Sequence, residues 1–232
     1  LYEQGRMQNG RDLPVSEALT MAIHESQSLF WERMIAQGKP FCARYLPLVA
    51  ETFPHNFRDV NSEQFYEAVN VSGPSLIRVE ADEVTYPMHV ILRYELEKGL
   101  FDGSIQVEHL PEMWNAKMKE YLGVEPPTDT LGVLQDTHWS GGAFGYFPSY
   151  TLGAIYASQF YQALIRAEPG IEKQIEMGNL APVREWLGIQ IHQQGRLLSV
   201  PALVKRVTGE NLNPDNFLDY LKNKYRQIYR LN

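Results

Sequence analysis

Hydrophobic residues recur every three or four positions along most of the chain, which is the spacing of amphipathic helices. The clearest such segment covers residues 15–38; it follows Pro14 and ends at Gly38, with Pro40 shortly beyond. Similar segments, bounded by glycine and proline, cover residues 62–72, 87–99, 109–123, 150–168, 172–178, 181–195 and 213–229. The pattern therefore predicts an all-α, mainly helical fold.

Two stretches depart from this pattern. Residues 71–86 are rich in β-branched side chains, and they fit either a strand or a helix that is interrupted at Pro87. Residues 138–150 are rich in glycine and aromatic residues. The chain has no repeat period, low-complexity tract or long linker, so we expect residues 1–232 to form a single helical domain.

Composition narrows the possible functions. The net charge of −7 argues against nucleic acid as a partner. No run approaches the roughly 18 apolar residues of a membrane span, and residues 1–12 lack the apolar core of a signal peptide. We therefore expect a cytoplasmic protein with no membrane partner. The one cysteine, Cys42, lies in an apolar run, which predicts a buried and unreactive thiol.

The predicted helix over residues 15–38 carries polar groups next to its apolar positions. Glu25 shares a helix face with Ala22, Ser28 and Leu29, so its carboxylate would lie beside apolar neighbours. A carboxylate in such a place is exposed, pairs with an arginine such as Arg78, or coordinates a metal. The pattern alone leaves these alternatives open.

Charged residues are dense in residues 77–89, which include Arg78, Glu80, Asp82 and His89. They fit a solvated surface. They also fit a binding site in which Arg78 offers a planar, bidentate fork to a carboxylate while the acids hold that fork in place.

Residues 132–150 combine polar and aromatic groups around a pair of glycines. Gln135, Asp136 and His138 precede the glycines, and Tyr146 and Tyr150 follow them. Such a stretch fits either a packed loop or the wall of a ligand pocket. A histidine and a tyrosine acting as paired donors would stabilise an oxyanion. The chain lacks the motifs of serine hydrolases, P-loop NTPases, Rossmann dehydrogenases and zinc ribbons.

Three of these stretches together resemble one family. "HESQ" at 24–27, "IRVEAD" at 77–82 and "GVLQDTHW" at 132–139 are similar to signature blocks of the carboxypeptidase Taq family of metallocarboxypeptidases, and they occur in that family's order. Similar residues surround them, including "FGYFPSYTLG" and "VTGENLNPDNFLDYLKNKY". The resemblance extends over essentially the whole chain.

The resemblance implies a cytoplasmic, homodimeric, helical zincin-like peptidase with a long substrate groove, which removes C-terminal amino acids from peptides with a zinc-activated water. Glu25 matches the third zinc ligand of the family, and His24 and Ser28 would orient the ligands. His138 and Tyr146 would donate to the tetrahedral oxyanion. The residues expected on the substrate-binding side are Arg78, Gln135, Asp136 and Tyr150, with Arg78 holding the terminal carboxylate.

One family motif is absent from these residues. No His-Glu-x-x-His occurs in the 232 residues; in the family it precedes the stretch "LYEQG" with which the sequence opens. A catalytic zinc needs three protein ligands and a water. We therefore expect the chain to be the C-terminal portion of such an enzyme, to bind Zn²⁺ (or Co²⁺) weakly or not at all without its N-terminal part, and to be inactive alone. The alternative is a non-catalytic helical module that binds peptides or associates with itself.

Overall fold

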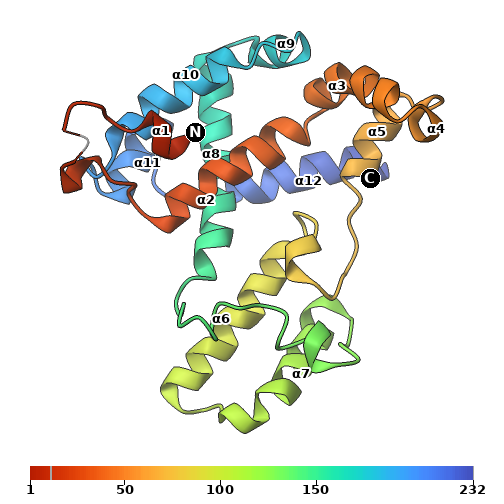
Figure 1. Ribbon diagram of the computed structural model, residues 1–232, viewed down its shortest axis with the longest axis vertical. Helices are drawn as coiled ribbons and strands as arrows, with labels where there is room; N and C mark the ends of the chain where they lie inside the picture. The colour runs from red at the N-terminus through yellow and green to blue at the C-terminus, as the bar shows by residue number, and fades with distance from the viewer. Residues whose placement is uncertain (11, 232) are drawn as a thin grey trace. The chain divides into compact units, whose positions relative to one another are not determined.

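The computed structural model describes residues 1–10 and 12–231, and within them every regular element is helical. The all-α prediction is confirmed. Contacts between Cα atoms divide the chain into two compact units: unit 1 comprises residues 1–70 and 152–232, and unit 2 comprises residues 71–151 (Figure 1). The single domain expected over residues 1–232 stays a prediction.

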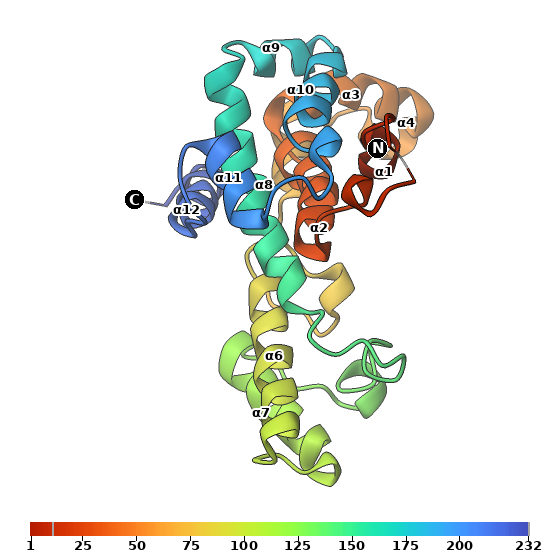
Figure 2. The ribbon, with the colours of Figure 1, turned by 90° about the vertical axis from the view of Figure 1, so that its left-hand side faces the viewer.

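Unit 1 contains most of the helices. They are α1 (Tyr2–Gly5), η1 (Pro14–Ser16), α2 (Met21–Leu29), η2 (Phe30–Ala36), α3 (Lys39–Thr52), α4 (Pro54–Phe57), α5 (Ser62–Val69), α9 (Ile171–Glu176), α10 (Ala181–Gln190), η6 (His192–Gln194), α11 (Val200–Thr208), α12 (Asp215–Tyr229) and most of α8 (Pro148–Ala167). Apolar side chains from many of these helices meet in one buried cluster, in which Ile23, Phe30, Phe160 and Leu187 are fully buried. Figure 2 shows α8 among the other helices of this unit. A smaller cluster joins Cys42 and Tyr66 to Tyr225 and Ile228. Cys42 is also buried, as the sequence predicts.

Helices α2 and α8 approach each other closely in this core. A Cβ atom added at Gly153 of α8 would lie 2.9 Å from the Cβ of Glu25 and 3.1 Å from the backbone nitrogen of Ser26. Real Cβ atoms do not approach that closely, so this crossing requires glycine. The contact fixes the backbone of the segment that carries Glu25.

The helix predicted over residues 15–38 begins later than expected. Thr20 is extended (φ −150°, ψ 163°), and its hydroxyl accepts a hydrogen bond from the Ile23 amide at 3.3 Å, which caps α2. The prediction was wrong about residues 17–20. Hydrophobic spacing extends the helix back to residue 15, whereas the cap at Thr20 makes α2 begin at Met21. From Phe30 to Ala36 the backbone is π-helical; such turns are rare in proteins.

Unit 2 is built around two helices that pack against each other, α6 (Tyr86–Asp102) and α7 (Leu110–Leu122). The short 3₁₀ turns are η3 (Arg78–Glu80), η4 (Val107–His109) and η5 (Asp129–Leu131). Leu92 and Leu96 of α6 pack with Trp114 and Met118 of α7 in a buried cluster. The unit also contains the first residues of α8.

Residues 71–85 form neither a strand nor a long helix, and the Asp82 carboxylate organises them. It accepts hydrogen bonds from the hydroxyls of Ser72 (2.8 Å) and Thr85 (2.7 Å) and from the amides of Gly73, Val84 and Thr85. Burial opposes ionisation of Asp82, but these hydrogen bonds outweigh it and lower the pKa of the carboxyl. The segment therefore satisfies its backbone locally instead of in a sheet.

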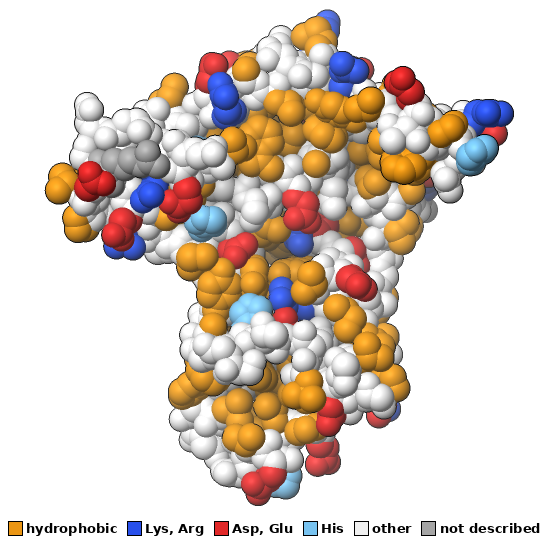
Figure 3. All heavy atoms as spheres, in the orientation of Figure 1, with side chains coloured by type: hydrophobic (Ala, Val, Ile, Leu, Met, Phe, Trp, Pro, Cys, Tyr) orange, Lys and Arg blue, Asp and Glu red, His pale blue; other side chains and the backbone are white. Residues whose placement is uncertain are grey.

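The charge and the apolar character of the surface are relevant to two partners, nucleic acid and membrane, that the sequence argues against. Acidic and basic side chains are interspersed on the face shown in Figure 3, without a continuous basic surface. No helix among the described residues combines the length and the apolar character that crossing a membrane requires.

Candidate functional site

The centre of unit 2 is a carboxylate shared by two arginines. Oδ1 of Asp136 accepts hydrogen bonds from Nε (3.0 Å) and Nη2 (2.6 Å) of Arg78, while Oδ2 accepts one from Nε of Arg93 at 2.7 Å. The side chains of Arg78, Arg93 and Asp136 are 6%, 0% and 8% exposed. Two guanidinium groups and one carboxylate are thus buried together, and the cluster carries one net positive charge.

The ionisation states support this charge count. Burial alone would raise the pKa of Asp136, but the hydrogen bond from Arg78 and the charges of both arginines lower it below its ordinary value. Burial lowers the pKa of Arg93 to about 10, partly offset by Asp136. All three groups are therefore charged at pH 7.

Gln135 holds both arginines from a second side. Its Oε1 accepts from the backbone amide of Arg78 and from Nη2 of Arg93, each at 2.8 Å. Its Nε2 donates to the carbonyls of Leu76 (3.0 Å) and Leu131 (3.2 Å). Four hydrogen bonds thus fix the orientation of this amide, and with it the backbone that carries Arg78.

Aromatic side chains pack around Arg78 in this cluster. Nε2 of His138 lies 3.0 Å from the hydroxyl of Tyr150, whose ring lies 4.8 Å from the Arg78 guanidinium carbon. The His138 ring packs against Phe147, with centroids 4.4 Å apart, and lies 5.6 Å from the ring of Tyr146. The structure therefore brings together all six of the residues that the sequence singled out in this unit.

Three buried polar residues of α6 lie in or beside this cluster but were not singled out. Tyr86 accepts a hydrogen bond from Nη1 of Arg78 at 2.6 Å, and Glu97 accepts one from Nε1 of Trp139 at 2.8 Å; Arg93 is the third. All three are buried, and their spacing is that of one face of a helix. Charged residues on the apolar face of the helix predicted over residues 87–99 were the signal that could have revealed Arg93 and Glu97.

Glu25, the acid predicted to bind a metal, lies in unit 1. Glu25 is half-buried on α2, and the hydroxyl of Ser28 lies 2.9 Å from its carbonyl oxygen and 3.4 Å from its Oε2. His24 faces α1 instead: its Nε2 lies 3.6 Å from Oε1 of Glu3, and its ring lies 5.5 Å from that of Tyr2. Ser28 therefore contacts the proposed ligand directly, whereas His24 contacts Glu3 and Tyr2 of α1.

A second histidine, His192, links α1 to α2, although the sequence did not indicate a role for it. Nε2 of His192 lies 2.9 Å from Oε1 of Gln27. A Cβ atom added at Gly5 would lie 2.5 Å from Nδ1 of His192. Nε2 of Gln27 donates to the hydroxyl of Ser26, which in turn donates to the carbonyl of Ile23. These contacts hold the segment that surrounds Glu25 against the first residues of the chain.

The described residues do not form a complete metal site. Residues 1–10 and 12–231 contain no group of three or more His, Cys, Asp or Glu side chains that could hold an ion. Glu25 is the one side chain predicted from the sequence to be a ligand, so the fit of the described residues to a catalytic metal is partial.

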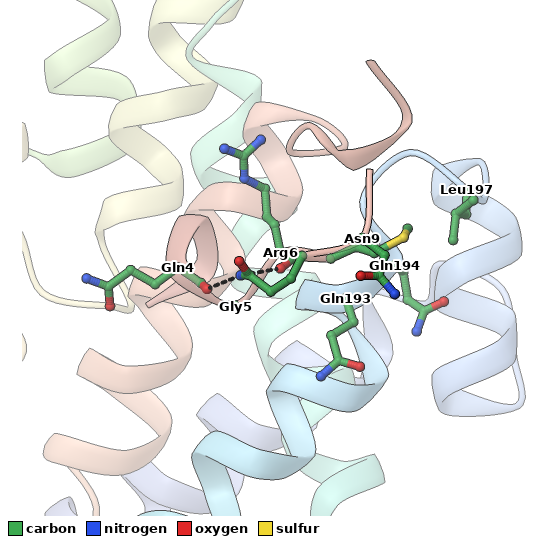
Figure 4. A pocket seen from close by; sticks show the side chains of 9 residues that line it. Gln4, Gly5, Arg6, Asn9, Gln193, Gln194 and Leu197 are labelled. Carbon is green, nitrogen blue, oxygen red and sulfur yellow. Dashed lines mark hydrogen bonds between the residues drawn. The ribbon is translucent and has the colours of Figure 1, made fainter. Parts of the chain in front are cut away.

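A hollow elsewhere in unit 1 is lined by residues of a different kind. It measures about 590 Å³, and the side chains that point toward it in Figure 4 are mostly neutral amides. Its lining residues are Gln4, Gly5, Arg6, Met7, Gln8, Asn9, Gln193, Gln194 and Leu197. Without an acid or a histidine in its lining, it is no candidate for the catalytic site.

Comparison with known proteins defines the class first. A crystal structure of an M32 carboxypeptidase from Deinococcus radiodurans R1 superposes with a TM-score of 0.95 at 36% identity, covering 99% of this chain and 46% of that one. Trypanosoma cruzi metallocarboxypeptidase 1 superposes with a TM-score of 0.89 at 40% identity, over 97% of this chain and 47% of that one. The chain thus has the helical fold of metallocarboxypeptidases.

Sequence comparison then gives the family. The pattern described as carboxypeptidase Taq (M32) metallopeptidase matches residues 1–225, and the chain belongs to this family. Carboxypeptidase 1 of Bacillus subtilis (strain 168) is 44% identical over 231 residues, which are 100% of this chain and 46% of that protein. Thermostable carboxypeptidase 1 of Thermus thermophilus is 45% identical over 230 residues, 99% of this chain and 45% of that protein. The chain therefore spans less than half the length of these relatives.

Proposed function

We propose that these residues form the part of a metallocarboxypeptidase that binds the C-terminal carboxylate of a peptide and supports hydrolysis of its last peptide bond. The observation that carries this proposal is the buried cluster with one excess positive charge around Asp136. Asp136 and Tyr86 accept from three N–H groups of Arg78. A guanidinium has five N–H donors, so within the described residues two remain for a ligand carboxylate.

The other residues have defined tasks in this proposal. Asp136 and Gln135 orient Arg78, and Tyr150 packs against it on the substrate-binding side. His138 and Tyr146 donate to the oxyanion of the tetrahedral intermediate, where each donor contributes on the order of 10²-fold to kcat. Each of these residues acts by holding a group or donating a proton at a defined atom.

The metal is expected to be zinc, with cobalt as an alternative. When bound, it would lower the pKa of a water molecule toward 7 and polarise the scissile carbonyl. Glu25 is the proposed protein ligand from this chain, Ser28 orients its carboxylate, and His24 supports the segment through α1. Because zinc needs three protein ligands, we propose that the chain is inactive unless the remainder of the protein supplies the other two.

The substrates, the cellular location and the oligomeric state are also inferred from the family resemblance. We propose that peptides are the substrates and that the complete protein is cytoplasmic and homodimeric. The missing N-terminal part of the same protein would be the partner that completes the site.

The test compares a peptide with a free C-terminus and the same peptide as its C-terminal amide, using the natural gene product that carries these residues. We expect stepwise release of single amino acids from the free acid and a kcat/KM at least about 10²-fold lower for the amide, since the amide removes a charge-assisted contact. The products are followed by mass spectrometry.

Arg78→Lys tests the residue assigned to the carboxylate. It keeps the charge but loses the bidentate fork, so kcat/KM for the free acid should fall on the order of tenfold or more, while the value for the amide changes little. Equal cleavage of acid and amide by the unaltered protein would contradict the proposed function.

A further inference from the structure

We propose that Arg93 is a positioning residue that makes the carboxylate site cationic: it neutralises Asp136, so that Arg78 keeps its positive charge for the ligand. This inference rests on the proposed function, because it concerns the same site. It assigns to a side chain of α6 a role at a ligand that this side chain does not touch.

The contacts of Arg93 show that it acts through other residues. Nε donates to Asp136 at 2.7 Å, Nη2 to Gln135 at 2.8 Å, and Nη1 to the carbonyl of His89 at 2.7 Å. Its guanidinium carbon lies 4.4 Å from the centre of the Trp114 ring, and its side chain is 0% exposed. Every nitrogen of the guanidinium is engaged by the protein, so Arg93 is placed to hold partners and not to bind a ligand.

The charge of the cluster depends on this residue. With Arg93, two arginines face one carboxylate, and the sum is +1; without it, Arg78 and Asp136 form a neutral pair. Among the described residues, Asp136 is the one acid that forms an ion pair with either arginine. The nearby Glu97 is instead bonded to Trp139 and the amide of Gly145.

His89 does not add to this charge. Burial, together with the charges of Arg93 and Arg78, lowers its pKa to about 4, so the ring is neutral at pH 7. Neither ring nitrogen of His89 has a hydrogen-bond partner in the described part of the chain. The positive charge available to a ligand therefore comes from Arg78, as long as Arg93 balances Asp136.

The expected size of the effect follows from Coulomb's law. One unit charge lost about 8 Å from a bound carboxylate, at an effective dielectric constant of about 20, weakens binding on the order of thirtyfold. A neutral ligand of the same shape would lose little. Selectivity for the charged ligand is therefore the informative quantity, because a purely structural defect would weaken both ligands.

The experiment uses the metal-free natural gene product and two probes, an N-acetyl amino acid and its amide, with affinities measured by isothermal titration calorimetry. Arg93→Met should weaken binding of the acid by about ten- to thirtyfold and leave binding of the amide within about threefold. The double variant Arg93→Met, Asp136→Asn again has a net charge of +1, and it should recover binding of the acid to within about threefold of the unaltered protein.

Arg93→Lys is the matched control, since it keeps the charge without the three hydrogen bonds. It should retain most of the preference for the acid. Arg93→Lys and the double variant keep the net charge of +1 that the cluster has in the unaltered protein, so they test the proposal even if Arg93→Met does not fold. Thermal unfolding of each variant reports folding separately.

The outcomes separate the two proposals. If the unaltered protein binds acid and amide equally, the carboxylate site fails and the role of Arg93 fails with it. If the unaltered protein prefers the acid and Arg93→Met keeps that preference, or if the double variant loses still more of it, the role of Arg93 is overturned while the proposed function stands.

Discussion

At the scale of single residues, the polar groups of the carboxylate site in unit 2 are held by hydrogen bonds to one another. Asp82, Gln135 and Asp136 each use nearly all of their hydrogen-bonding capacity. The sequence indicated such residues by type and density, but it could not tell a solvated cluster from a buried network. His89 is an exception, since it is fully buried and neither ring nitrogen has a hydrogen-bond partner among the described residues.

His89 should therefore make unit 2 sensitive to acid. Its folded pKa of about 4 lies below the ordinary 6.5, so the unfolded chain binds more protons between these values, and the free energy of unfolding falls as pH drops from about 6.5 to 4. His89→Leu removes this titration. The loss of stability between pH 7 and 4.5, measured by urea unfolding, should shrink by about 2 kcal/mol.

The control for this prediction is the exposed His55, changed to leucine in the same way. It should leave the pH dependence as it is in the unaltered chain. An equally steep loss of stability in His89→Leu would show that the ring is already protonated, or solvated, in the folded protein.

At the scale of elements, hydrophobic spacing predicted α5, α6, α7, α8, α9, α10 and α12 close to where they lie. It did not predict α3, because Pro40 and Pro47 interrupt the pattern there, although the helix accommodates both. It also placed the start of α2 too early, since a cap is a local hydrogen bond and hydrophobic spacing does not detect it. How closely two helices approach is a further property that periodicity does not give.

The crossing of α2 and α8 at Gly153 should tolerate no side chain. Gly153→Ala gains up to about 1 kcal/mol of helix propensity, but its Cβ would collide with Glu25 and Ser26. We expect a net loss of about 1–3 kcal/mol in the free energy of unfolding, measured by chemical denaturation.

Gly188→Ala in α10 is the matched control, because a Cβ atom there meets nothing within 4 Å. It should stabilise the chain by up to about 1 kcal/mol. Stabilisation by both substitutions would mean that α2 and α8 separate readily, and that the backbone of Glu25 is not held by this contact.

At the scale of the whole molecule, the chain covers less than half of its relatives' length, and its described residues lack a complete set of metal ligands. The residues that match the family's signature blocks divide between the two units, with Glu25 in unit 1 and Arg78 and His138 in unit 2.

The purified chain of 232 residues should accordingly hold little zinc. After dialysis against micromolar zinc, elemental analysis should find well below one ion per chain, since three protein ligands are needed for a catalytic site. The natural gene product should hold about one, and Glu25→Gln in that protein should lower the content. One tightly bound ion in the 232-residue chain would contradict the partial-site interpretation.

The sequence by itself determined the helical class, the buried thiol and the family, because hydrophobic spacing, apolar context and ordered motifs are properties of short segments. Only the tertiary structure decided that Arg78 and Arg93 share one carboxylate, since Asp136 lies 58 and 43 positions away from them. Partners so distant are chosen by how the helices pack, and the same packing removes the water that would otherwise screen the charges. The excess positive charge of this site is therefore a product of the fold.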